Sequence, residues 1–372
     1  MIKYANIRRI HIELTARCQA SCPGCPRNVY GGYAIPDLDK TEWTASEFRT
    51  SFRPEFLSQL QHILFCGNYG DPGIARELLP ILRYVTENTS AQVTVHTNGG
   101  MRSTEFWYAV GTVLRKSGKV VWSFDGLWDT NHIYRKGVDW DRAWANAESY
   151  ISTGARATWE MLVFKHNEHQ VRECEALSKQ SGFHQFIYKR ALGFEHTPVM
   201  KTLDKSGKLC YTISEPSKAY TNIANTHTGR SNTRDLTPTE YEKLLDRQMT
   251  VYANTGFRHE HTQDIHCETQ HNKEIYVDSA GTVYPCCHIG HASQHTAGEL
   301  YIQNREWLRE RFGSRNLSCK FNDLQDIVDS DYFRRIQATW KLPTDNQNRI
   351  AMCSAMCAKR NNKMQSVYES IR

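Results

Sequence analysis

The amino-acid sequence predicts an α/β protein with a parallel sheet, and two observations support this fold class. Short apolar, β-branched runs alternate with longer amphipathic stretches through the first half of the chain. Each strand and the helix after it take about 30 residues, which is typical of right-handed crossovers between parallel strands. Six such units fit either an open doubly wound sheet or a partial (β/α)6 barrel, and in both folds ligands bind at the carboxyl ends of the strands.

Each expected strand is a short apolar run bounded by polar or turn residues. The strands are expected at Arg9–Leu14, His62–Cys66, Gln92–Thr97, Lys119–Phe124, Thr158–Phe164 and Phe183–Lys189. The helices between them are expected at Thr44–Leu60, Ile74–Glu87, Ser103–Lys116, Trp140–Ser152 and Glu168–Gln180. Thr44 with Glu47 three residues later is a capping-box pattern that marks the start of the first helix. Tryptophans at strand or helix spacing are expected in the core: Trp122, Trp128, Trp140 and Trp144.

The pattern changes in the second half of the chain. Residues 193–264 are polar and show no sustained period, so we expect a long insertion with one helix near Pro238–Thr250. From Ile265 a smaller unit begins, with a hairpin followed by amphipathic helices. The hairpin is expected at Lys273–Val277 and Thr282–Tyr284, and the helices near Glu306–Arg311 and Asp331–Thr339. The chain therefore divides into residues 1–192, 193–264 and 265–372.

Composition limits the possible functions. The 372 residues are 40% hydrophobic and 23% charged, and the net charge of +6 permits an anionic partner without requiring one. The sequence has no uncharged apolar run of about 18 residues that would span a membrane. Its first residues lack an apolar signal core, so we expect a cytoplasmic protein. In that reducing compartment, 12 cysteines indicate metal binding or catalysis rather than disulfides.

The first group of cysteines follows the first expected strand. Cys18, Cys22 and Cys25 lie within eight residues, on a loop that contains Pro23 and Gly24. Thiolates are ligands of soft metals and of iron–sulfur clusters, and three local ligands would leave one iron of a four-iron cluster open. The alternative is a zinc site with a distant fourth ligand, such as a histidine.

This C-x3-C-x2-C segment after the first strand resembles the signature of the radical S-adenosylmethionine (SAM) superfamily. The resemblance implies a partial (β/α)6 barrel in which Cys18, Cys22 and Cys25 bind a [4Fe–4S] cluster. It also implies that SAM binds to the open iron and is reductively cleaved to a 5′-deoxyadenosyl radical, which abstracts a hydrogen atom from the substrate. That chemistry belongs to the cofactor, while the protein orients it and excludes water.

The resemblance extends to the ends of the next strands. FCGNYGDP loosely resembles a Gly-Gly-Glu-Pro turn that binds SAM, and YRKG resembles an Arg-x-Gly segment. The residues that the resemblance assigns to SAM binding are Gly67, Gly70, Asp71, Asn98, Ser123, Asp125 and Arg135. Three of these have ordinary alternatives: Asp71 as a helix cap, Asn98 as a turn residue and Arg135 as a solvated loop residue.

A second group of cysteines lies near the C-terminus. Cys267 precedes the expected hairpin, Cys286 and Cys287 follow it, and Cys353 and Cys357 are four residues apart, on one face if helical. A four-thiolate site would bind zinc by default. IYVDSAGTVYPC instead resembles the hairpin of the twitch/SPASM extension, which implies an auxiliary [4Fe–4S] cluster in a small α+β domain. The implied ligands are Cys267, Cys286, Cys353 and Cys357, with Cys287 as a substitute for Cys286 and Cys319 as a possible extra.

The resemblance implies an oxygen-sensitive enzyme with an external electron donor such as flavodoxin or ferredoxin. Its auxiliary cluster would bind substrate or accept an electron. The expected reaction is oxidation of a small polar molecule such as a sugar, aminocyclitol or nucleotide, and the alternative is modification of a peptide or protein. Cys66 and Cys210 are candidate hydrogen-atom donors, or idle thiols. A zinc-stabilised nucleic-acid-binding protein is the alternative of another class, although we expect neither a nucleic-acid nor a membrane partner.

Overall fold

The protein is described by a computed structural model. It covers residues 2–35, 38, 40–191, 194, 198–217, 223–226, 265–290, 308, 310–311, 313, 315–343, 346, 348–350, 352–353 and 357. In this part of the chain, no helix has both the length and the apolar character needed to cross a membrane.

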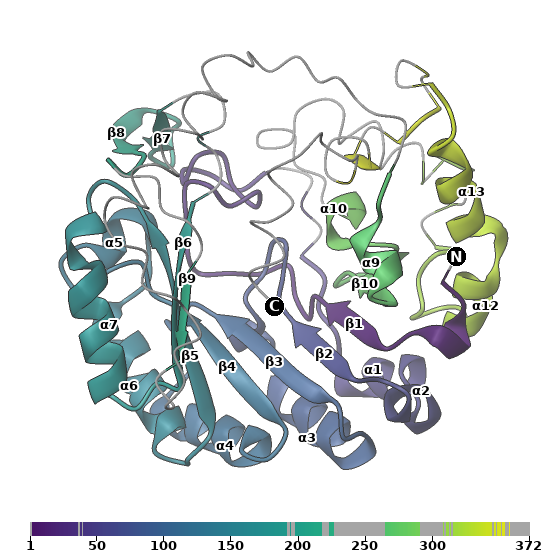
Figure 1. Ribbon diagram of the computed structural model, residues 1–372, viewed down its shortest axis with the longest axis horizontal. Coiled ribbons are helices and arrows are strands. Elements are labelled where there is room, and N and C mark those ends of the chain that lie inside the picture. Colours follow the sequence, from purple (N-terminus) through teal and green to yellow (C-terminus); the bar gives the residue numbers. More distant parts are fainter. Residues whose placement is uncertain are drawn as a thin grey trace, which may run out of the picture.

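A curved, mostly parallel sheet of nine strands is the framework of the fold (Figure 1). Its order is β11-β10-β1-β2-β3-β4-β5-β6-β9. Six parallel strands form its centre: β1 (Arg9–Ile12), β2 (His62–Phe65), β3 (Gln92–Thr97), β4 (Gly118–Ser123), β5 (Arg156–Val163) and β6 (Gln185–Arg190). The predicted α/β class is therefore confirmed, and the six central strands lie within two or three residues of their expected bounds.

The helices cover the outer side of this sheet (Figure 1). They are α1 (Ala45–Ser51), α2 (Pro54–Ser58), α3 (Leu78–Asn88), α4 (Thr104–Leu114), α5 (Asn131–Tyr134), α6 (Trp140–Ile151) and α7 (Val171–Gln180). The single helix expected over Thr44–Leu60 is wrong, because Arg53 takes the extended conformation that a following proline favours. The chain breaks there and Pro54 starts α2, whereas Thr44 and Glu47 form the predicted capping box of α1.

An aromatic core fills the space between the sheet and these helices. Trp122 of β4 and Trp159 of β5 are fully buried, and Trp159 lies 5.5 Å from Trp144 of α6 between ring centroids. The alternation of side chains along a strand sends the neighbouring residues to the other, inner face. The prediction that Trp128 lies in the core is wrong, since 71% of this residue is exposed in the loop after β4.

The insertion contains regular structure that the sequence pattern did not predict. β7 (Val199–Leu203) and β8 (Leu209–Ser214) form an antiparallel hairpin, and β9 (Ile223–Thr226) pairs with β6. The turn between β7 and β8 is made by the Asp204 carboxylate, which accepts hydrogen bonds from the backbone of Ser206 and Lys208. The helix expected near Pro238–Thr250 lies outside the described residues.

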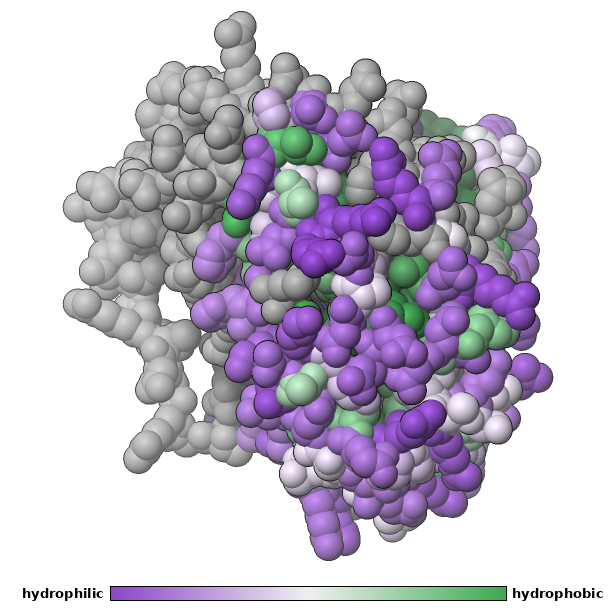
Figure 2. Space-filling model, turned by 90° about the vertical axis from the view of Figure 1, so that its right-hand side faces the viewer, coloured by the Kyte–Doolittle hydropathy of each residue, from purple (hydrophilic) through white to green (hydrophobic). Residues whose placement is uncertain are grey.

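The C-terminal hairpin extends the barrel sheet. β10 (Glu274–Val277) pairs parallel with β1, and β11 (Val283–Tyr284) pairs antiparallel with β10. Four helices accompany the hairpin: α9 (Glu268–His271), α10 (Cys287–Gly290), α12 (Leu324–Asp329) and α13 (Asp331–Thr339). α13 has the predicted bounds, whereas the helix expected near Glu306–Arg311 lies mostly outside the described residues. The molecular face that carries these helices is largely hydrophilic, with small separate hydrophobic patches (Figure 2).

Candidate active site

The first cysteine group lies on a hydrogen-bonded turn directly after β1. The backbone N–H of Cys25 donates to the carbonyl of Cys22 over 3.0 Å, and Asn28 Nδ2 donates to the same carbonyl over 3.2 Å. Cys22 is buried, and Cys18 and Cys25 are half-buried. The turn therefore presents three thiols at the carboxyl edge of the parallel sheet, where ligands bind in such folds.

Asn98, at the end of β3, connects this turn to the sheet. Its Nδ2 lies 3.5 Å from the sulfur of Cys18 in donor geometry. Its Oδ1 accepts hydrogen bonds from Gln19 Nε2 and from the backbone N–H of Gly100. The amide is thus oriented with its N–H group toward the sulfur, which would stabilise a thiolate.

Asp125 and Arg135 form a buried ion pair beside the same turn. Arg135 Nε lies 2.6 Å from Asp125 Oδ2, and the backbone N–H of Leu162 donates to the other carboxylate oxygen over 2.7 Å. Burial raises the pKa of the Cys22 thiol to about 11, although the adjacent Arg135 guanidinium opposes this shift. Burial likewise raises the pKa of Cys18 and of Cys25. Ionised thiols therefore need positive charge at this site, and Arg135 supplies part of it.

Asp71 is fully engaged in structural hydrogen bonds. Its carboxylate caps the 3-10 turn η2 (Pro72–Ile74) through the N–H of Gly73 at 2.8 Å. It also accepts from Thr97 Oγ1 at 2.8 Å and from the N–H of Asn98 at 2.7 Å. The capping alternative thus describes its contacts, and its assignment to SAM binding stays a prediction.

The turn of residues 67–70 lies between Asp71 and β2 and is held by Glu13, a residue that sequence reasoning missed. Glu13 Oε1 accepts from the N–H groups of Tyr69 (2.7 Å) and Gly70 (2.9 Å). Burial raises the pKa of Glu13 to about 7, against the opposing effect of these hydrogen bonds. A charged residue within the apolar run IHIEL was the available signal.

The inner face of the sheet is polar. Lys189 of β6 and Glu160 of β5 form an ion pair of 2.7 Å, and burial lowers the pKa of nearby His96 on β3. Ser123, predicted to contact SAM, is half-buried at the end of β4 and faces the same side as Glu160, its register partner on β5. The missed residues Glu160, Lys189 and His96 alternate with apolar ones along their strands, and this pattern was visible in the sequence.

The second cysteine group gathers around the C-terminal hairpin. Burial, followed by the neighbouring thiols of Cys287, Cys353 and Cys267, raises the pKa of Cys286. Cys357 reaches the same region, because its carbonyl accepts from the N–H of His266 over 2.8 Å. The structure therefore brings Cys267, Cys286, Cys353 and Cys357 into one neighbourhood.

Cys287 and Cys319 have different surroundings. Burial and then Glu274 raise the pKa of Cys287 to about 11, and Cys287 is itself among the thiols that raise the pKa of Cys286 and of Cys357. The backbone of Cys319 bonds to Gly281 at the hairpin turn and to Ser51 at the end of α1. Cys319 is thus held by other partners, and the choice of Cys286 over Cys287 as a ligand stays a prediction.

The candidate hydrogen-atom donors differ in location. Cys66 ends β2 on the inner face, half-buried, and its carbonyl accepts from His11 Nε2 over 2.7 Å. Cys210 is exposed on β8, away from this face. Cys66 is thus the candidate on the inner face, and the hydrogen-atom-donor roles of both cysteines stay predictions.

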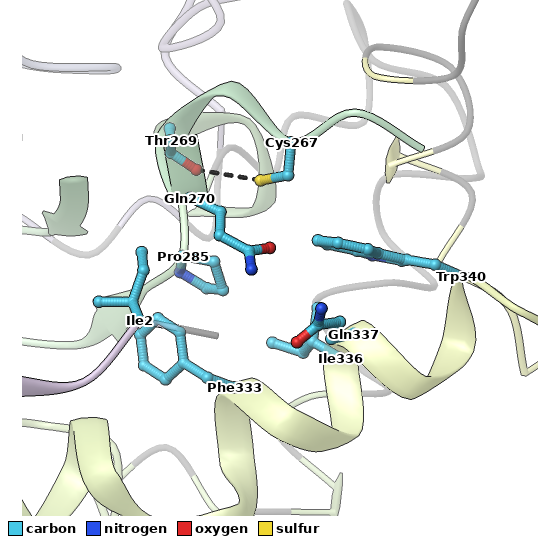
Figure 3. Close-up of a pocket in the computed structure, with 9 residues that line it drawn as sticks. All are labelled: Ile2, Cys267, Thr269, Gln270, Pro285, Phe333, Ile336, Gln337 and Trp340. Carbon is cyan, nitrogen blue, oxygen red and sulfur yellow. Dashed lines mark hydrogen bonds between the residues drawn. The ribbon is translucent and has the colours of Figure 1, made fainter. Parts of the chain in front are cut away.

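A small pocket adjoins the second cysteine group (Figure 3). The side chains of Gln270 and Gln337 point into it, and the ring of Trp340 closes one side. Cys267 lies at its upper edge, where its sulfur is 3.3 Å from Thr269 Oγ1. Within the described ranges, no three or more His, Cys, Asp or Glu side chains are arranged to hold a metal ion. The seven ligand assignments therefore stay predictions.

Solved structures resemble nearly the whole chain. SuiB of Streptococcus suis bound to S-adenosylmethionine matches with a TM-score of 0.52 and 14% identity, over 94% of this chain and 72% of SuiB. anSMEcpe with bound AdoMet also matches with a TM-score of 0.52, at 13% identity, over 98% of this chain and 92% of that protein. Both are radical SAM enzymes.

The chain has the radical SAM fold. The predicted partial barrel is thereby confirmed, and the cysteine turn after β1 lies at the position where the sequence resemblance put it. No protein-family model and no curated protein sequence matches the chain. The likeness to radical SAM enzymes is therefore one of fold, and the assignment of function depends on the site itself.

Proposed function

We propose that the protein is a radical SAM enzyme in which Cys18, Cys22 and Cys25 hold a [4Fe–4S] cluster that binds SAM. The observation that carries this proposal is the loop after β1, which has three thiols at the carboxyl edge of the sheet and a hydrogen-bonded turn from Cys22 to Cys25. The donor set fits such a cluster, because thiolates are its ligands and Asn98 and Arg135 direct N–H groups or positive charge at the sulfurs. When bound, the cluster and SAM would supply reductive cleavage to the 5′-deoxyadenosyl radical.

The protein's own contribution is to orient SAM and the substrate. Gly67 and Gly70 let the turn pack against Thr15 and against itself, because a Cβ at either position would overlap a backbone carbonyl oxygen. Ser123, Asn98 and the Asp125–Arg135 pair surround the same edge, and Arg135 would attract the carboxylate of SAM.

A second cluster held by Cys267, Cys286, Cys353 and Cys357 is the other part of the proposal. Support for one neighbourhood comes from the causes of the raised pKa of Cys286, Cys353 and Cys357, which name the other thiols of the set. The auxiliary cluster would bind the substrate or accept the electron that remains after hydrogen abstraction. Reduction of the first cluster requires an external donor such as flavodoxin or ferredoxin.

The polar inner face supports a substrate rich in hydrogen-bonding groups. Glu160 and Lys189 offer an acceptor and a donor, both partly exposed, and His96 lies beside them. A small polar molecule such as a sugar, aminocyclitol or nucleotide would suit this face. A peptide is the second candidate, because SuiB bound to precursor peptide SuiA matches this fold with a TM-score of 0.51, at 15% identity, over 95% of this chain and 73% of SuiB.

Anaerobic iron and sulfide analysis tests the proposal. We expect brown protein with about eight irons per chain, four per cluster, and 5′-deoxyadenosine on reduction in the presence of SAM. Cys22→Ala should lose about half of the iron and all SAM cleavage, whereas Cys210→Ala, which removes an exposed thiol, should retain the iron. A colourless, zinc-loaded wild type whose nucleic-acid affinity falls steeply with salt would establish the alternative instead.

A further inference from the structure

The turn of residues 67–70 has almost no freedom to move. A Cβ added to Gly70 would lie 1.6 Å from the carbonyl oxygen of Thr15, and one added to Gly67 would lie 2.3 Å from the carbonyl oxygen of Gly70. The next residue, Asp71, donates its N–H to the carbonyl of Arg17 over 2.9 Å. The turn is therefore packed directly on the segment that leads into Cys18.

Glu13 connects this turn to the C-terminal hairpin. One carboxylate oxygen holds the N–H groups of Tyr69 and Gly70, and the other accepts a 2.7 Å hydrogen bond from the hydroxyl of Tyr276 on β10. Glu13 is 1% exposed, so water does not replace these partners. The orientation of the carboxylate, and with it that of the turn, therefore depends on Tyr276.

A second contact joins the same two elements. Asn68 Nδ2, within the turn, donates to the carbonyl of Cys287 over 3.0 Å. Cys287 starts α10, one residue after the proposed cluster ligand Cys286. The turn is thus attached at one side to β10 and at the other to the start of α10.

Tyr276 is itself fixed by the hairpin. It is paired with His11 across β1 and β10, and the two rings meet edge to face with centroids 4.8 Å apart. Tyr284 of β11 stacks on it at 6.0 Å. α10 also lies close, because a Cβ on Gly290 would be 2.4 Å from the Tyr276 ring. The phenol cannot move unless the hairpin or α10 moves.

We propose that the C-terminal hairpin is a component of the SAM site, in which Tyr276 and the Cys287 carbonyl position the SAM-binding turn through Glu13 and Asn68. The inference rests on the proposed function, since it assigns SAM to the turn of residues 67–70. Tyr276, Glu13 and Asn68 are positioning residues that act through the backbone of the turn. The barrel itself supplies the Glu13 contacts to the backbone of the turn, whereas the contacts from Tyr276 to Glu13 and from Asn68 to Cys287 need the hairpin and α10, more than 200 positions along the chain. SAM affinity therefore depends on both parts of the chain.

SAM binding to the anaerobically reconstituted full chain tests this inference. Tyr276→Phe removes one hydroxyl and Asn68→Ala removes one amide. Each variant should raise the dissociation constant for SAM about tenfold, as the loss of one buried hydrogen bond does. The iron content should stay at the wild-type value. SAM changes the electron paramagnetic resonance spectrum of the reduced cluster, and the variants should need about ten times more SAM than the wild type for the same change. Tyr150→Phe is the matched control, because it removes a buried hydroxyl that donates to Arg156, at the amino end of the sheet.

Substitution of Glu13 adds a rescue test. Glu13→Gln keeps an oxygen for the two backbone N–H groups and should retain SAM affinity, whereas Glu13→Leu should lose it. Hydrogen–deuterium exchange of a peptide covering residues 66–71 should speed up in Tyr276→Phe even without SAM, which reports on the turn alone.

Two results would overturn the inference. Wild-type SAM affinity in both Tyr276→Phe and Asn68→Ala would show that the hairpin does not position the turn. A wild type that contains iron but binds no SAM would refute the proposed function and the inference with it. The exchange measurement separates these cases, because it detects the coupling between hairpin and turn independently of SAM.

Discussion

Arg135 Nε donates a 2.6 Å hydrogen bond to Oδ2 of Asp125, and this ion pair closes the end of β4 beside the cysteine turn. The Asp125 side chain is fully buried and that of Arg135 is 17% exposed. The backbone N–H of Leu162 donates to the other carboxylate oxygen of Asp125, and Asn167 Nδ2 donates to the backbone carbonyl of Asp125. The pair thus joins β4, β5 and the loop after α5 in one buried polar group.

Removal of one partner of this ion pair should destabilise the fold strongly. Arg135→Gln leaves a buried carboxylate without its countercharge, which costs about 3–5 kcal/mol. We expect the double variant Asp125→Asn, Arg135→Gln to recover much of the free energy of unfolding in urea. Arg76→Gln is the control: Arg76 pairs with Glu42 but is 74% exposed, and its loss should change the free energy of unfolding far less.

Ionisation of Glu13 should lower the free energy of unfolding as the pH rises. Its folded-state pKa of about 7 lies above the ordinary value of 4.5, so folding favours the protonated carboxyl. The stabilisation is complete below about pH 4.5 and is lost as the pH rises through about 7, a difference of about 3 kcal/mol. This difference is measured by thermal unfolding of the wild type and of Glu13→Gln at about pH 5 and about pH 8. The Gln variant should lack this pH dependence, and Glu87→Gln on the surface of α3 should keep it.

Cys286 and Cys287 should differ in iron binding although they are adjacent. Cys286 is the ligand that the sequence resemblance implies, and Cys353 and Cys267 contribute to its raised pKa, whereas burial and Glu274 are the main causes of the raised pKa of Cys287. Cys286→Ala should therefore lose about half of the iron, about four atoms per chain, and Cys287→Ala should keep it. Iron analysis of the two variants decides between them, and the reverse result would assign Cys287 as the ligand.

Gly70→Ala should be far more damaging than Gly154→Ala. The new Cβ would overlap the carbonyl oxygen of Thr15 at 1.6 Å, and a backbone shift to avoid it should cost about 3 kcal/mol or more. At Gly154 a Cβ meets no atom within 4 Å, and only the positive φ of 78° opposes it, at about 1 kcal/mol. Urea unfolding compares the two. Equal effects would show that the turn of residues 67–70 can relax.

The local features of the fold were predictable because they depend on neighbouring residues. β3 has the predicted bounds, and Thr44 with Glu47 forms the predicted capping box. α13 also has its predicted bounds. The hairpin β7–β8 was missed although its strands are largely apolar, because they are short runs within a polar stretch and four of the six residues of β8 are exposed.

By itself, the sequence determined the order of strands and helices and the spacing of Cys18, Cys22 and Cys25, since both follow from residues that are close in the chain. Only the tertiary structure placed β10 beside β1 and thereby brought Tyr276 to Glu13. It also gathered Cys267, Cys286, Cys353 and Cys357, which lie on distant segments, around the hairpin. The physical reason is that strand pairing and burial across hundreds of residues leave no local pattern, because the partners meet only when the whole sheet forms.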